Sequence, residues 1–173
     1  MNEIERLTLI NQFEILKSLN PEENSYYSEK IEILEEGYKF HYEDIFNSLS
    51  PELPEEDSRF VIDVLNMYRD VNFSKSKFNS ENLKEIQEIS TYYMGFDYND
   101  EHEVRLGIYA KFFIEKLDRF QELIEDEDFN GFNSHLEMKN RYRKSLDTYN
   151  NLKNSNVIEF SNLTPSQIKE ILG

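Results

Sequence analysis

Hydrophobic residues recur every three or four positions along most of the chain, which predicts amphipathic α-helices. The first run extends from Ile4 to Leu19 and ends at Asn20-Pro21, where the proline suits the first turn of a second helix. That second helix is expected to end at Gly37. Because the link between them is so short, the two helices are predicted to form a hairpin.

The rest of the chain carries further helical runs after one clear break. Pro51 and Pro54 predict a boundary between an N-terminal subdomain, residues 1–50, and a C-terminal subdomain, residues 51–173. The second subdomain is expected to surround a long central helix from about Asp100 to about Ile124. The pattern therefore predicts an all-α fold of about eight helices, with the N-terminal hairpin packed against a second helical subdomain.

Two similar tripeptides, Gly95-Phe96-Asp97 and Gly131-Phe132-Asn133, flank the predicted long helix. In each, we expect the glycine to adopt a left-handed conformation that closes a helix, and the Asp or Asn to begin capping the next one. Capping-box spacing predicts three helix starts, at Asp100 with Glu103, Ser134 with Glu137, and Thr164 with Gln167. The side chains expected to be largely buried are Phe96, Phe112, Phe113, Leu117, Phe120 and Tyr142.

Composition narrows the possible partners. The 173-residue chain has a net charge of -16, which disfavours direct binding to nucleic acid or to an anionic membrane. It has no cysteine, so disulfides and zinc–thiolate sites are excluded. The N-terminus lacks the pattern of a signal peptide, and no apolar run approaches the roughly 20 residues of a membrane span. These features favour a cytoplasmic protein.

Catalytic signatures are missing: the chain has no phosphate-binding glycine loop, no Gly-x-Ser-x-Gly and no His-Glu-x-x-His. The three histidines fall in different predicted elements. Asp97 is expected to cap a helix, and Asp63 to pair with Arg59 four residues earlier. We therefore assign no catalytic residue, and the absence of enzymatic activity is the preferred interpretation.

One basic cluster interrupts the acidic chain, at Lys139, Arg141, Arg143 and Lys144. It is compatible with an anion site. The alternatives are local neutralisation of the acidic loop before it, or a charge match across an oligomer interface.

The acidic loop matches the calcium-loop pattern D-x-[DN]-x-[DN]-G-x₅-E. In such a loop the ligands would be Asp126, Asp128, Asn130, the carbonyl of Phe132, and Glu137. The alternative is an acidic surface loop in which Glu137 takes part in capping the following helix. No other cofactor is expected.

Short segments along nearly the whole chain carry a family resemblance. They include Arg6–Phe13, Leu19–Pro21, Ile33–Tyr38, Met94–Asp97, Leu106–Gly107, Gly131–Asn133 and the Leu163–Leu172 tail. On these segments the chain resembles the YfbU family of uncharacterised bacterial proteins. The resemblance implies an all-helical fold and a cytoplasmic, bacterial setting, and it implies no established activity, cofactor or catalytic residue.

The leading functional hypothesis is a non-enzymatic helical interaction or regulatory module that self-associates, since acidic and basic surfaces coexist on one chain. An alternative is an acidic protein that mimics nucleic acid and inhibits a basic nucleic-acid-binding protein, and a third is a metal-dependent hydrolase. The residues expected to make contacts in the leading hypothesis are Asn11, Gln12, Tyr38, Lys139, Arg141 and Arg143.

Overall fold

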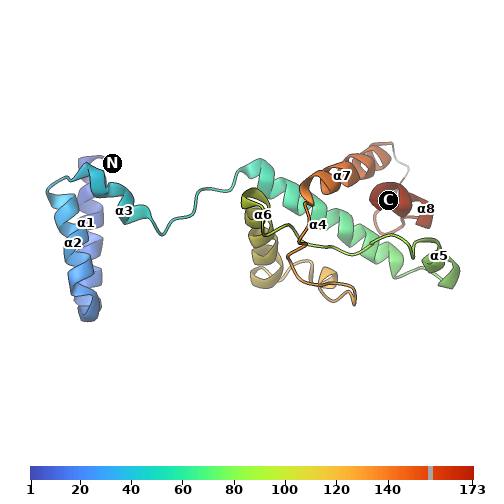
Figure 1. Cartoon of the computed structure of the whole chain (residues 1–173), viewed down its shortest axis with the longest axis horizontal. Coiled ribbons are helices and arrows are strands. Elements are labelled where there is room, and N and C mark those ends of the chain that lie inside the picture. Colours follow the sequence, from blue (N-terminus) through green and yellow to red (C-terminus); the bar gives the residue numbers. More distant parts are fainter. Residues whose placement is uncertain (156–157) are drawn as a thin grey trace. The chain divides into compact units, whose positions relative to one another are not determined.

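The computed structural model describes residues 1–155 and 158–173 (Figure 1). These residues form eight α-helices and no strand, which confirms the predicted all-α fold. Contacts divide the chain into two compact units, Met1–Glu52 and Leu53–Gly173. Within the described residues, none of the helices combines the length and the apolar composition that crossing a bilayer requires.

The N-terminal unit is a helix hairpin followed by a short helix. Its elements are α1 (Glu3–Leu19), η1 (Pro21–Glu23), α2 (Asn24–Glu35), η2 (Lys39–His41) and α3 (Tyr42–Phe46). The Asn2 side chain caps α1 in a capping box with Glu5. Arg6 on α1 donates to the carbonyl of Leu34 at 2.7 Å and to that of Glu35 at 2.8 Å, so it satisfies the carbonyl end of α2 and ties the hairpin together.

The C-terminal unit is built on its longest helix, α4 (Glu55–Lys75), which contacts α6 and α7 (Figure 1). The other elements are α5 (Ser80–Glu85), α6 (Glu101–Lys111), the π-helical turn η3 (Phe112–Lys116), η4 (Gln121–Leu123), α7 (Lys139–Asn154) and α8 (Pro165–Leu172). As predicted, Thr164 and Gln167 form a capping box at the start of α8.

An aromatic cluster occupies the centre of this unit. Tyr68, Tyr93, Phe96 and Tyr142 are fully or almost fully buried, and the Phe96 and Tyr142 rings meet edge to face at 5.4 Å. The Tyr142 hydroxyl donates to the Gly95 carbonyl at 2.9 Å. Burial raises the pKa of Tyr93 and of Tyr142 well above the ordinary value, so both hydroxyls stay protonated and act as uncharged core groups.

The two Gly-Phe tripeptides, far apart in sequence, bind each other. The Phe96 N–H donates to the Phe132 carbonyl at 2.9 Å, and the Ser134 N–H donates to the Phe96 carbonyl at 3.0 Å. Gly95 and Gly131 have φ values of 79° and 94°, as predicted. The expectation that they close helices is wrong, because α5 ends ten residues before Gly95 and η4 ends eight residues before Gly131. Both glycines instead lie next to the backbone hydrogen bonds that join Phe96 to Phe132 and Ser134.

The predicted long central helix is also wrong, since α6 ends at Lys111 and its last turn widens into η3. The backbone then turns through left-handed conformations at Asp118 and Phe120. Phe96, Phe113, Phe120 and Tyr142 are buried as expected, but Phe112 and Leu117 are about half exposed. The extra residue of a π turn rotates the following side chains relative to an α-helix. Packing of the Arg69 guanidinium over the Phe120 ring, at 3.9 Å, stabilises the altered course.

The predicted helix start at Ser134 and Glu137 is wrong as well. Helix α7 begins at Lys139, without a side-chain cap from the residue before it. Its first N–H groups bind the Glu103 carboxylate, which belongs to α6. Asp100 does cap α6, but the reciprocal bond expected from Glu103 is replaced by these bonds to α7 and to the Asp97 N–H.

Candidate interaction surface

The outward face of α1, meaning the side turned away from α2, carries apolar side chains that the hairpin does not cover. Phe13 faces α2 and is half-buried, and no residue of α1 is fully buried. Ile4, Leu7, Ile15 and Leu19 are 78%, 59%, 59% and 70% exposed. At about 100° per residue, Ile4 and Ile15 lie half a turn from Phe13. Helix α1 is therefore apolar on both sides, and α2 covers only one of them.

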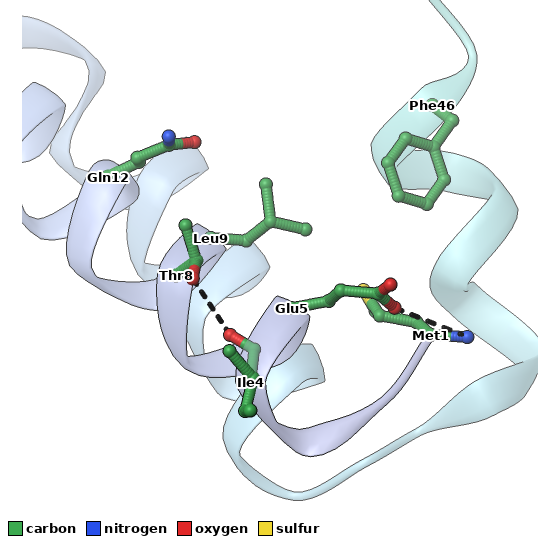
Figure 2. Close-up of a pocket in the computed structure, with 7 residues that line it drawn as sticks. All are labelled: Met1, Ile4, Glu5, Thr8, Leu9, Gln12 and Phe46. Atoms are coloured by element: carbon green, nitrogen blue, oxygen red, sulfur yellow. Dashed lines mark hydrogen bonds and ion pairs between the residues drawn. The ribbon is translucent and has the colours of Figure 1, made fainter.

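A groove beside this face adds to the apolar surface. It has a volume of about 550 Å³ and is lined by Met1, Ile4, Glu5, Thr8, Leu9, Gln12 and Phe46. Figure 2 shows Leu9 and Phe46 pointing toward each other across it. The Thr8 hydroxyl donates to the Ile4 carbonyl at 2.8 Å, and the terminal ammonium lies 4.0 Å from Glu5. Because these polar groups have partners within α1 or its N-terminus, the groove presents mainly hydrocarbon.

The predicted contact residues of the N-terminal unit occupy different parts of it. Asn11 is exposed, on the outward face midway between Leu7 and Ile15. Gln12 is exposed and lines the groove (Figure 2). Tyr38 precedes η2 in the loop after α2, and its side chain is also exposed. Sequence reasoning identified Asn11 and Gln12 as polar contact residues, but it described the neighbouring apolar residues only as a helical stripe.

The basic cluster does not form one patch. The Arg143 guanidinium lies 5.9 Å from the Phe60 ring, and Arg143 and Lys139 line a cavity of about 230 Å³. Arg141 points elsewhere, toward the Met94 sulfur at 3.8 Å. Alternate residues of a helix project in different directions, so the cluster read as continuous in sequence is divided in space.

The same cavity borders a polar network that joins the first turns of three helices. His102 Nε2 lies 2.9 Å from a carboxylate oxygen of Asp57, which is buried. Lys139 Nζ lies 3.1 Å from His102 Nδ1 and 4.0 Å from Asp57. Both ring nitrogens of His102 are thus engaged, and the network links α4, α6 and α7. No local sequence pattern indicates the distant partners of Asp57.

Three of the five predicted calcium ligands, at Asp126, Phe132 and Glu137, have protein partners. Asp126 pairs with Lys75 at 3.3 Å, and its other oxygen accepts the Asp128 N–H at 3.1 Å. The Phe132 carbonyl accepts the Phe96 N–H, and Glu137 accepts a hydrogen bond from Asn140. Asn130 is exposed. Within residues 1–155 and 158–173, no group of three or more His, Asp or Glu side chains could hold a metal ion.

Calcium binding at this loop stays a prediction with a direct test. If Asp126, Asp128, Asn130, Phe132 and Glu137 rearrange into a site, titration with calcium at low ionic strength gives heat and raises the unfolding temperature. Glu137→Gln should then remove both signals, because the twelfth residue of such a loop supplies two ligand oxygens. Calorimetry that shows no heat for either protein contradicts the hypothesis.

The carboxylates considered for a metal-dependent hydrolase have separate surroundings. Asp97 accepts both the backbone N–H and the side-chain amide of Asn99 and forms a local turn. Asp63 is exposed and lines a cavity of about 290 Å³ with Asn66 and Lys153. Arg59 pairs with Glu55 at 2.6 Å in place of the expected Asp63.

Comparison with known proteins identifies the family. Residues 1–173 match the YfbU domain family. The UPF0304 protein MJECS11 of Methanocaldococcus jannaschii is 36% identical over 150 residues, which span 86% of this chain and 87% of the relative. That relative is archaeal, so family membership does not by itself indicate a bacterial source, contrary to the expectation from sequence. The match over the whole length shows that the chain belongs to the YfbU family.

Proposed function

We propose that this protein is a non-enzymatic helical interaction module that self-associates through the outward face of α1. The observation that carries the proposal is the exposure of Ile4, Leu7, Ile15 and Leu19 on one side of a helix whose other side already packs on α2. A contiguous apolar patch on a small helical unit is typical of an interaction site. The proposal also holds that the protein has no enzymatic activity, in line with the missing catalytic signatures, and that it is cytoplasmic.

The free energy gained by burying these side chains is large enough to support a dimer. Burying a fully exposed Leu or Ile side chain contributes about 1.5–3 kcal/mol. Four side chains that are mostly exposed therefore offer roughly 4–8 kcal/mol per copy, before the adjoining groove is counted. Two copies offer twice this, which is enough to offset the 4–15 kcal/mol or so that association costs in lost freedom of motion.

The chain offers a matched pair of variants to test self-association. Leu19 on α1 and Leu49 after α3 are both 70% exposed, so neither is needed for the core of the unit. We expect size-exclusion chromatography with light scattering to show a dimer for the wild type and for Leu49→Glu. Leu19→Glu should weaken the dimer roughly a hundredfold, because placing an unpaired carboxylate in an interface costs about 3 kcal/mol.

Far-UV circular dichroism of both variants serves as the folding control. A wild-type protein that stays monomeric at high concentration contradicts the proposal. Equal weakening by Leu19→Glu and Leu49→Glu would show that association does not use α1.

A further inference from the structure

We infer that two copies pair through α1 in an antiparallel orientation, with the Asn11 residues of the two chains facing each other at a twofold axis. This inference rests on the proposed self-association and adds the orientation and register of the contact. Three features of the N-terminal unit lead to it: the order of residues on the outward face, the acidic groups along α1, and the position of the groove.

The spacing of apolar residues along the outward face is nearly symmetric about Asn11. Leu7 and Ile15 lie four residues to either side, while Ile4 lies seven residues before it and Leu19 eight residues after it. A twofold interface brings the same surface of both copies together. With Asn11 at the axis, Leu7 of one copy lies opposite Ile15 of the other, and Ile4 lies opposite Ser18 and Leu19.

Asn11 suits the centre of such a pairing. A side-chain amide both donates and accepts hydrogen bonds, so two facing asparagines can satisfy each other. A single asparagine within an apolar helix seam fixes the register, because any shift leaves the amide against hydrocarbon. Asn11, midway along the exposed apolar face, therefore acts as a register mark.

Charge separates the antiparallel arrangement from the parallel one. In a parallel pair each residue lies level with its own copy, so Glu5 would lie level with Glu5 and Glu14 with Glu14. The two positive helix ends would also be adjacent, and so would the two negative ends. In the antiparallel pair Glu14 lies level with Thr8 and Glu5 with Lys17, and each helix dipole opposes the other.

The groove gives an independent reason for the same orientation. It lies at the N-terminal end of α1, between Ile4, Leu9 and Phe46 (Figure 2). Leu19 lies at the opposite end of α1 and is 70% exposed. Only an antiparallel pair brings Leu19 of one copy to the groove of the other. The exposed Leu19 side chain at the C-terminal end of one α1 then packs into the groove at the N-terminal end of the other.

Single-cysteine variants test this geometry, and the absence of native cysteine makes each disulfide unambiguous. The axes of packed helices lie about 8–10 Å apart, so facing positions approach the roughly 4.4–6.8 Å Cα separation that a disulfide requires. Three variants are each oxidised alone in a glutathione buffer: Ile4→Cys, Ser18→Cys and Asn11→Cys. Ile4→Cys and Ser18→Cys are also oxidised together as an equimolar mixture. Leu49→Cys measures cross-linking by random collision. Products are identified by intact mass under non-reducing conditions.

In the antiparallel pair we expect Asn11→Cys to form a homodimer. Ile4→Cys and Ser18→Cys should cross-link only when mixed, because fourteen residues of helix, or about 21 Å, separate like positions at the ends. Homodimers of Ile4→Cys and of Ser18→Cys in yields above the Leu49→Cys control would show a parallel pair and overturn the inference.

A wild-type dimer in light scattering with no Asn11→Cys cross-link would also overturn it. In both cases self-association itself still stands, whereas a monomeric wild type rejects the proposed function. The two failures are therefore distinguishable.

Discussion

Replacing Gly95 by alanine is expected to destabilise the C-terminal unit by about 4 kcal/mol or more, which is at the upper end for a single substitution. A Cβ atom at Gly95 would lie 2.1 Å from the carbonyl oxygen of Phe132 and 2.3 Å from its carbonyl carbon. Both contacts are with backbone, so no side-chain rotation relieves them. The backbone must separate, and separation breaks the Phe96–Phe132 hydrogen bond and displaces the carbonyl that binds Tyr142.

Gly131→Ala is the matched control, because Gly131 also has a positive φ and a Cβ there would meet no atom within 4 Å. We expect it to cost only the left-handed strain of a non-glycine residue, about 1–2 kcal/mol. Urea unfolding followed by near-UV circular dichroism reports the packing of the buried tyrosines, which lie mostly in this unit. Similar losses of stability for the two variants would contradict the close approach at Gly95.

Removing the Glu103 carboxylate should have the second large effect. Glu103 is almost fully buried and accepts the N–H groups of Asp97 at 2.9 Å, Met138 at 3.0 Å and Lys139 at 2.7 Å. It thereby holds the loop before α6 and the first turn of α7 together. Glu103→Ala leaves three N–H donors without their acceptor, each worth about 1–3 kcal/mol when buried, so we expect a loss of about 4 kcal/mol.

Glu103→Gln should lie between wild type and Glu103→Ala, at about 2 kcal/mol, because the amide keeps one acceptor oxygen but turns a donor toward backbone donors. Glu101→Ala, at an exposed position in the same turn of α6, should change the free energy of unfolding by no more than about 0.5 kcal/mol. The same urea experiment measures all three. If Glu103→Ala is no more harmful than Glu101→Ala, the carboxylate does not hold α6 and α7 together.

Local patterns in the sequence were sufficient for the fold class and for several helix ends. The spacing of apolar residues predicted the α1 and α2 hairpin, because a helical period is a property of neighbouring residues. Asp100 and Thr164 were correctly predicted as caps, since a cap bonds to N–H groups two or three residues away. The YfbU family was also recognisable from short segments in order.

Of the candidate surface, the sequence identified the polar members and missed the apolar ones. Asn11 and Gln12 were predicted as exposed contact residues, whereas Ile4, Leu7 and Leu19 were read as part of an ordinary helical stripe. Periodicity indicates that a side chain is apolar and where it lies around the helix. It does not indicate whether another element covers that side.

Tertiary structure alone decided the features that depend on distant partners. Glu103 has the spacing of a local cap but binds the start of α7, 35 residues later, and Gly95 is required by the backbone of Phe132. After α6 the chain turns through left-handed conformations at Asp118 and Phe120, and the Arg69 guanidinium of α4 packs over the Phe120 ring at 3.9 Å. In each case a contact between segments far apart in the chain outweighs a preference of about 1 kcal/mol or less per residue, which is all that local sequence supplies.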